Sequence, residues 1–280
     1  MNTTVKLLGL DFGTTNTSAA WCDAQGEVHL VPVREGVHTL PSVVCFHGGG
    51  TLVGEPARQL AADDPRHTIY GVKRFLGRRF FSDYVGRHRS RFVFQLAEGA
   101  EGMTAIEVHG KVVPLEEVAL AIVRRMVELA NIALGEPFEE CVCSVPAHFS
   151  QRQRRIIAGV VKSAGLRLKA MVNEPTAASL FYAKHQSEDT KVLVYDLGGG
   201  TFDVSVLEIQ GGTFHVLGTG GDGFLGGVDF DIRLTEYLLE RFEKEEGIRL
   251  RDDPVVVLLR RRLRGGVGSE ELPRFATAAR

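Results

Sequence analysis

The sequence predicts an α/β protein with two lobes around a shared cleft. Strand-like runs alternate with amphipathic helices along the 280 residues, as is typical of α/β layers. Two hairpins of the same design, at residues 7–21 and 192–207, lie far apart in the chain, and one copy in each lobe is the simplest arrangement. The chain is 44% hydrophobic and 24% charged, which is the composition of a globular protein with room for two modest domains.

The N-terminal elements begin with strand-like segments over residues 5–46. Charged, aromatic and glycine-rich stretches then indicate an inserted subdomain over about 40–113, which ends in a short hairpin at 105–113. From Pro114 to Gly135 apolar residues recur at helical spacing, and the glycine marks the end of the predicted helix.

The middle of the chain repeats a strand followed by a helix. A strand is predicted over 139–149, and Ser150 with Gln153 has the spacing of a capping box that opens the next helix. Residues 169–185 predict a short strand, a turn at Glu174 and another helix.

The C-terminal elements follow a polar segment at 184–191, which we interpret as a link between lobes. The hairpin at 192–207 comes next, and a strand is predicted at 213–218. A glycine-rich loop is predicted at 218–227, before a helix that carries apolar residues over 230–242.

The two hairpins carry the chemistry at their turns. In "VLVYDLGGGTFDVSVL" three glycines, Gly198–Gly200, interrupt an otherwise buried pattern, which makes sense where the backbone must approach something closely. Such a turn can point several N–H groups at a phosphate, and Asp196 and Asp203 suit a hard cation that accompanies it. Asp11 and Thr14 occupy the matching places in the first hairpin.

Composition and charge argue against several classes of protein. The formal net charge of −2 gives no global case for binding nucleic acid or a membrane surface. No run approaches the ~18 apolar residues of a membrane span, and the start of the chain does not have a signal-peptide pattern, so we expect a cytoplasmic protein. Four cysteines do not make a disulfide framework here, and Cys141 and Cys143 fall on one face of a predicted strand, which favours core packing.

Three other motifs are interpreted as structural. "GTGGDG" at 218–223 fits a dinucleotide fingerprint, but Gly226 and Gly227 delay the helix that this mechanism needs close by. "HGGG" at 47–50 lacks the nucleophile elbow that an esterase would add, and is interpreted as a turn. The basic cluster at 87–91 is interpreted as a solvated helix face.

Six segments together resemble the ATPase domain of Hsp70 (DnaK-like) chaperones, in order and at similar spacing over about residues 5–245. They are "LGLDFGTTNTS", "GVKRFLGRRF", "CSVPAHFSQRQR", "VNEPTAASLFYA", "VYDLGGGTFDVSVLEI" and "GDGFLGGVDFD". The resemblance implies an actin-like ATPase (ribonuclease H-like) fold, with ATP and Mg²⁺ held between two lobes.

The resemblance also implies roles for individual residues, which agree with the need of phosphoryl transfer for positioning and charge stabilisation. The residues expected to take part in catalysis are Lys73, Glu174, Asp196, Thr201 and Asp203. The residues expected to hold the nucleotide are Gly13, Thr14, Thr15, Asn16, Gly198, Gly199, Gly200, Thr201, Gly226 and Gly227. Asp11 and Asp196 are expected to hold Mg²⁺ through water.

By the same resemblance the partners are a J-domain co-chaperone, a nucleotide exchange factor and unfolded client proteins. Pro146 and Arg154 match positions associated with signalling between the lobes and with co-chaperone contact. Neither nucleic acid nor membrane is an expected partner.

The resemblance predicts lobe I at 1–188, a partial lobe II at 189–247 and a divergent tail at 248–280. The tail shows neither helical nor strand periodicity. This favours a truncated or frame-shifted copy of a longer gene over a short protein that uses the phosphate-binding turns for another purpose. By the resemblance, the residues that contact phosphate are present while those that contact adenosine are largely missing, so we expect weak binding of ATP and an exposed sheet edge in lobe II.

Two alternatives stay open at this point. One is a non-catalytic remnant or regulatory module of the same superfamily, and the other is a sugar or metabolite kinase. Without the resemblance, the basic residues Arg74, Arg78 and Arg79 would place the neighbouring Lys73 on the surface, and Glu174 would only begin a turn.

Overall fold

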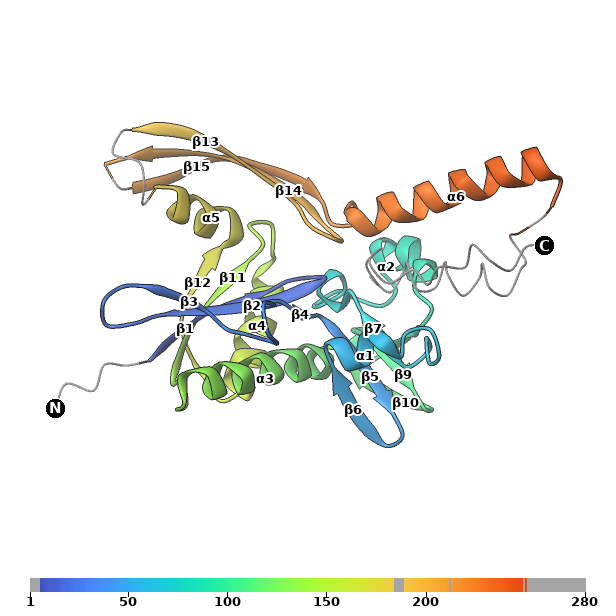
Figure 1. The fold of residues 1–280 in the computed structure, drawn as a ribbon, viewed down its shortest axis with the longest axis horizontal. Coiled ribbons are helices and arrows are strands. Elements are labelled where there is room, and N and C mark those ends of the chain that lie inside the picture. The colour runs from blue at the N-terminus through green and yellow to red at the C-terminus, as the bar shows by residue number, and fades with distance from the viewer. Residues whose placement is uncertain (1–5, 184–188, 212, 249, 251–280) are drawn as a thin grey trace.

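The computed structural model describes residues 6–183, 189–211, 213–248 and 250. Most of the predicted link at 184–191, and nearly all of the tail at 248–280, lie outside these described residues. Figure 1 shows a large sheet with helices below it and a separate three-stranded sheet above it. We refer to residues 6–183 as the N-terminal part and to residues 189–248 as the C-terminal part.

The largest sheet has six strands in the order β12-β11-β1-β2-β3, with β4 pairing to β2. Its strands are β1 (Leu7–Phe12), β2 (Asn16–Cys22), β3 (Val28–Leu30), β4 (Leu40–Pro41), β11 (Glu140–Val145) and β12 (Arg167–Asn173). β1 and β2 form the predicted first hairpin, and β1 also pairs in parallel with β11. Leu8, Leu10 and Phe12 alternate with exposed residues along β1, so one face of this strand enters the core.

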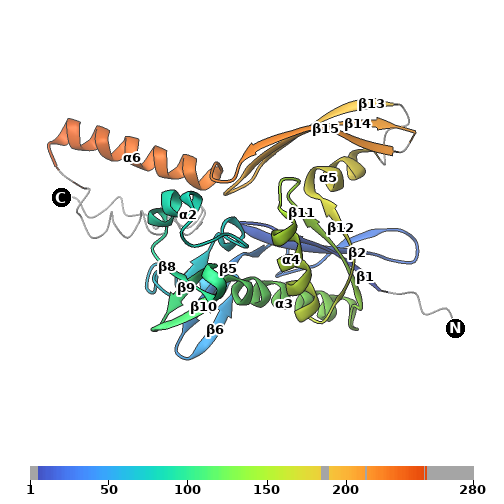
Figure 2. The same cartoon turned by 180° about the vertical axis from the view of Figure 1, so that it is seen from behind.

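Two helices pack beneath this sheet and against each other, as Figure 2 shows from behind. They are α3 (Leu115–Leu134) and α4 (Gln151–Ser163). Gly135 ends α3 in the left-handed conformation, and Ser150 and Gln153 form the predicted capping box of α4. Cys141 and Cys143 are fully buried, which confirms their core assignment, and burial raises the pKa of the Cys141 thiol to about 12.

The predicted insertion contains two small sheets, in the orders β6-β5-β7 and β10-β9-β8. Their strands are β5 (Val43–His47), β6 (Gly50–Val53), β7 (Thr68–Tyr70), β8 (Gln95–Glu98), β9 (Thr104–Val108) and β10 (Lys111–Pro114). The helical segments are α1 (Glu55–Gln59), η1 (Val72–Arg74), α2 (Asp83–His88), η2 (Arg89–Arg91) and η3 (Ala100–Gly102), of which the η segments are 3₁₀ turns. The "HGGG" motif is the turn from β5 to β6, where Gly48 and Gly49 have positive φ, as expected for a tight turn.

The C-terminal part is reached through α5 (Glu174–Ala183), which lies between the two sheets in Figure 1 and contacts both. Its sheet has the order β13-β14-β15, with β13 (Thr190–Leu197), β14 (Phe202–Gln210) and β15 (Thr213–Asp222). The predicted second hairpin is confirmed by the antiparallel pairing of β13 with β14. None of the helices among the described residues is long and apolar enough to cross a membrane.

The glycine-rich loop predicted at 218–227 is wrong over its first half, because β15 continues to Asp222. Gly220 and Gly221 pair with Val204 and Asp203 of β14, and a side chain on Gly221 would come within 2.2 Å of the Phe202 carbonyl oxygen. Cross-strand hydrogen bonds therefore hold this segment as a strand, although glycine has a low preference for strands. Because residues 218–222 form a strand, they cannot be the turn of a dinucleotide fingerprint.

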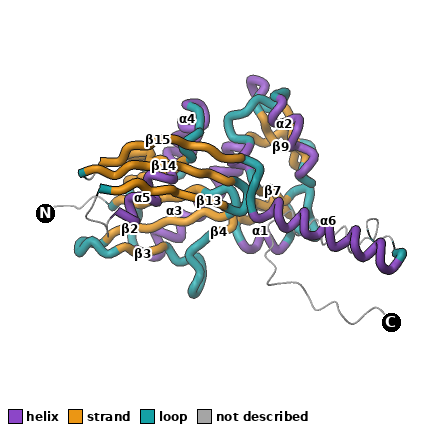
Figure 3. The backbone as a smooth tube through the Cα atoms, turned by 90° about the horizontal axis from the view of Figure 1, so that it is seen from above, coloured by secondary structure: helices purple, strands orange, loops and turns teal. Residues whose placement is uncertain are grey.

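The predicted C-terminal helix is α6 (Gly227–Glu246), which runs away from the sheet strands in Figure 3. Leu239 is its buried residue, although the sequence predicts a whole apolar face. The apolar residues of α6 that are exposed in the described structure are Phe230, Leu234, Tyr237, Leu238 and Phe242.

Candidate functional site

The turn of the first hairpin is tight and is anchored by the inserted subdomain. A side chain on Gly13 would come within 2.0 Å of the Asn16 carbonyl oxygen, so this position requires glycine. The Ser42 hydroxyl donates to the Gly13 carbonyl oxygen at 2.9 Å, and the Ser42 N–H donates to the Thr15 carbonyl oxygen at 2.8 Å. These bonds fix Thr14 and Thr15 at the mouth of the cleft.

The turn of the second hairpin is held from behind by the start of α6. Gly227 N–H donates to the Gly198 carbonyl oxygen at 3.0 Å, and Val228 N–H donates to the Gly199 carbonyl oxygen at 2.9 Å. Gly226 and Gly227 therefore support the glycine turn in this structure. The two hairpin turns themselves meet, since an ideal Cβ on Gly199 would lie 2.5 Å from the Thr15 hydroxyl oxygen.

Lys73 lies in η1, where only 6% of the residue is exposed. Its Nζ is 2.7 Å from Oε1 of Glu174 at the start of α5, and 6.0 and 5.8 Å from the ring centres of Phe12 and Phe149. Placing Lys73 on the surface from its basic neighbours is therefore wrong. Glu174 begins a helix rather than a turn. Burial raises the pKa of its carboxyl group, and the positive charge of Lys73 acts in the opposite direction and lowers that pKa.

Three aspartates surround the same region. Asp11 at the end of β1 accepts a hydrogen bond from the Ser144 hydroxyl at 2.8 Å. Asp196 and Asp203 face each other as register partners on β13 and β14, and His148 Nδ1 lies 3.0 Å from Oδ1 of Asp203. Asp196 as a residue is exposed, but partial desolvation of its carboxyl group in the cleft and the nearby charges of Asp203 and Asp11 raise its pKa. The site is therefore built to receive positive charge.

One cavity of about 670 Å³ brings most of the predicted site residues together. The predicted residues that line it are Asp11, Gly13, Thr14, Thr15, Asn16, Lys73, Glu174, Asp196, Gly198, Gly199, Gly200 and Thr201. Asp203, Gly226 and Gly227 do not line this cavity. A site with hydroxyls, a buried ammonium and glycine turns on its walls suits the phosphates of a nucleotide.

The carboxylates fit a cation that keeps most of its water. No group of three or more ligand side chains is arranged to grip a metal ion directly within the described parts of the chain. Mg²⁺ is commonly held by one or two carboxylates, phosphate oxygens and several waters, so Asp11 and Asp196 match its usual requirement.

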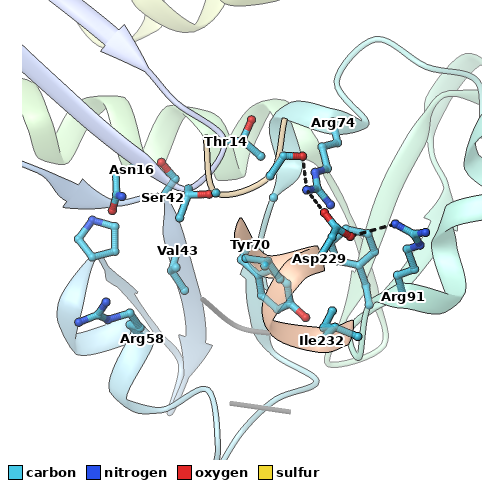
Figure 4. A pocket seen from close by; sticks show the side chains of 17 residues that line it. Thr14, Asn16, Ser42, Val43, Arg58, Tyr70, Arg74, Arg91, Asp229 and Ile232 are labelled. Atoms are coloured by element: carbon cyan, nitrogen blue, oxygen red, sulfur yellow. Dashed lines mark hydrogen bonds and ion pairs between the residues drawn. The ribbon is translucent and has the colours of Figure 1, made fainter. Parts of the chain in front are cut away.

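A second cavity of about 290 Å³ opens on the other side of the hairpin turns, between the insertion and the start of α6 (Figure 4). Arg58, Arg74 and Arg91 contribute to its walls, and Asp229 joins Arg74 and Arg91. None of these four residues was predicted from the sequence to belong to the site. The position of Arg74 directly after Lys73, in the same 3₁₀ turn, is the one local signal that could have found it.

Pro146 and Arg154 are brought together as a linked pair. The Arg154 guanidinium donates to the carbonyl oxygens of Pro146 and Ala147 and to Oδ1 of Asn173, the last at 2.8 Å. Arg154 therefore ties the end of β11 to the end of β12, directly before Glu174.

Replacing Asp196 with asparagine is expected to raise the melting temperature at pH 7 in the absence of ligand. The folded-state pKa of Asp196 lies above its unfolded value, so the folded protein binds more protons and loses stability as the pH rises through this range. Asparagine removes this loss of stability. The resulting rise in melting temperature should shrink as the pH approaches 3.8, the reference pKa of the carboxyl group. Thermal melts at several pH values test this, with the exposed Asp231→Asn as control, and a fall in melting temperature at pH 7 would contradict it.

The comparison with known families agrees with the site geometry. A family model described as "Hsp70 protein" matches residues 7–265. The match extends beyond residue 245, where we expected the resemblance to end, and it covers every residue of the candidate site.

Proposed function

Because the chain belongs to the Hsp70 family, we propose that the cavity of about 670 Å³ binds the phosphates of ATP and promotes their hydrolysis. The family has the actin-like ATPase fold and a chaperone ATPase type of function, and the mixed α/β structure accords with it. The buried Lys73–Glu174 pair carries the proposal, because it joins two segments 101 residues apart at the wall of the cavity between the glycine turns.

In the proposed reaction a water oxygen attacks the γ-phosphorus while the bond from this phosphorus to the bridging oxygen breaks, giving ADP and phosphate. The Lys73 ammonium would offset negative charge on the transferred group, and the hydroxyls of Thr14 and Thr201 would donate to phosphate oxygens. Glu174 would orient the attacking water, whose proton passes to the released phosphate. Mg²⁺, held through water by Asp11 and Asp196, would neutralise charge on the β- and γ-phosphates.

Packing and hydrogen bonds around these groups support the proposal. Lys73 is packed between two aromatic rings, and the first turn is hydrogen-bonded to Ser42. The second turn is bonded to the start of α6. Because little rearrangement is needed at the moment of reaction, such fixed groups can stabilise developing charge effectively.

The family membership extends the proposal to partners and location. We propose that residues 1–188 act as lobe I and residues 189–247 as part of lobe II, in a cytoplasmic chaperone. A J-domain co-chaperone, a nucleotide exchange factor and unfolded clients would be its partners. The Arg154 bonds to the ends of β11 and β12 offer a route by which a contact at α4 could reach Glu174.

Isothermal titration of Mg²⁺ and ATP into the purified chain tests this function, together with a hydrolysis assay. We expect saturable binding and hydrolysis that disappears in Asp196→Asn, while the exposed Lys162→Ala behaves as wild type. A well-folded chain that does not bind ATP would refute the proposal and favour a non-catalytic module.

A further inference from the structure

Phe224 connects the C-terminal part of the chain to the core of the N-terminal part. It lies between β15 and α6, yet only 5% of it is exposed. Its ring stacks on His88 at 3.6 Å and lies 5.2 Å from the ring of Tyr84 and 5.7 Å from that of Phe75. Among the described residues, Phe224 is the only member of the main core cluster that follows residue 166.

Charged side chains close around the same contact. The guanidinium carbon of Arg74 lies 4.5 Å from the centre of the Phe224 ring, and that of Arg91 lies 5.7 Å from it. Asp229, in the first turn of α6, has one oxygen 3.7 Å from Arg74 and the other 3.1 Å from Arg91. Arg74 also donates to the Gly200 carbonyl oxygen.

These contacts lie directly beside both halves of the proposed phosphate site. Arg74 follows Lys73 in η1, so the position of one guanidinium is tied to that of the lysine. On the other side, Phe224 and Asp229 flank the segment whose N–H groups hold the Gly198–Gly199 turn. A displacement of Phe224 would therefore change the separation between Lys73 and the glycine turn.

We propose that Phe224 and Asp229, seated against His88, Arg74 and Arg91, form a clasp that sets the width of the nucleotide cleft. The clasp consists of these five residues, and they are positioning residues, since none is assigned to the reacting atoms. Its effect on catalysis rests on the proposed ATPase function, whereas its effect on the spacing of the two parts does not.

The contacts have the strength that such a role requires. A buried aromatic ring packed on three other rings contributes through area and through the geometry of each ring pair. The desolvated Arg74 adds a cation–π contact and a hydrogen bond to the turn. Asp229 also caps α6 by accepting from Gly226 N–H at 3.1 Å, so replacing it would disturb the helix as well. Phe224 is therefore the cleaner residue to test.

The test measures the distance between the two parts by pulsed electron spin resonance. Spin labels are placed on cysteines introduced at the exposed Thr51 in β6 and Lys244 in α6, with exposed Cys22 changed to serine. Phe224→Ala is compared with Phe81→Ala, which removes the same side chain from a site that is 78% exposed. We expect a narrow distance distribution in wild type and Phe81→Ala, and a broader one, shifted to longer distance, in Phe224→Ala.

Nucleotide measurements on the same proteins separate this proposal from the previous one. In Phe224→Ala the KM for ATP should rise about 10- to 100-fold, because misplaced groups lose the bound geometry. Arg91→Ala, whose side chain is half-exposed, should give a smaller change in the same direction without harming the core. If wild type fails to bind ATP, the ATPase proposal fails, and the distance distributions still decide the clasp. If Phe224→Ala and Phe81→Ala give the same distribution, the clasp is refuted.

Discussion

Replacing Lys73 with methionine is expected to lower the rate of ATP hydrolysis by about 10²- to 10³-fold, the usual effect of removing one preorganised charge-stabilising group. Methionine fills much of the same volume and can remain between Phe12 and Phe149, but it carries no charge. Single-turnover hydrolysis measures the chemical step directly. The loss should appear in this step, with a smaller change in the affinity for ATP, because the lysine acts on charge that develops during transfer.

The same substitution also removes the partner of Glu174, and this effect must be separated from catalysis. Breaking a buried pair can cost about 3–5 kcal/mol of stability when the remaining charge is uncompensated. The pKa of Glu174 is already raised by burial, so the carboxyl group can take up a proton and lessen that cost. We therefore expect the single variant to be destabilised by less than the full amount.

A neutral pair provides the matched control. In Lys73→Met combined with Glu174→Gln neither position carries a charge, so chemical denaturation should show much of the lost stability restored, while hydrolysis stays at least as slow as in Lys73→Met. Lys162→Met, on the exposed face of α4, should change neither quantity. Hydrolysis at the wild-type rate in Lys73→Met, or its recovery in the double variant, would contradict the assigned role of Lys73.

The hairpins and their polar turns could be predicted because the signals are local. Asp11 and Asp196 each end an apolar run and precede a glycine turn, and strand pairing then fixes which residues face each other. The burial of Lys73 could not be predicted from such local signals. Its neighbours in sequence are basic, and the residue that makes its burial tolerable, Glu174, is 101 positions away. Burial of a charge depends on such distant partners.

The errors in the C-terminal part have the same origin. Glycines at 218–221 predicted a loop, because local preference says nothing of the β14 backbone that pairs with them. The periodicity of α6 predicted an apolar face correctly, but periodicity alone does not show whether another element covers that face. Phe224 and Leu225 stand between glycines in "GDGFLGG", without any periodic pattern, and the contacts of Phe224 lie in residues 74–91.

Replacing Gly226 with alanine is expected to detach α6 from the glycine turn and to reduce hydrolysis at least about 100-fold. The new Cβ would lie 2.4–2.6 Å from backbone atoms of Gly199 and Gly200, which cannot rotate away as a side chain could. The backbone of Gly226 is extended, with φ of −168°, so the effect is steric and does not come from a torsion that alanine avoids. The melting temperature should fall as well.

The neighbouring Gly227→Ala is the matched control, and it should change stability in the opposite direction. Its Cβ would lie 3.8 Å from the nearest atom, the Cα of Gly199, which is an ordinary contact. Alanine at the first position of α6 should stabilise the fold by about 0.4–1 kcal/mol, because the unfolded chain loses freedom and the N–H to Gly198 is kept. Thermal melts and hydrolysis assays on both variants test this pair. Equal losses of stability and hydrolysis in the two variants would mean that the glycine turn does not depend on the close approach of Gly226. A fall in stability for Gly226→Ala with a rise for Gly227→Ala would instead show that this single backbone contact supports the phosphate site.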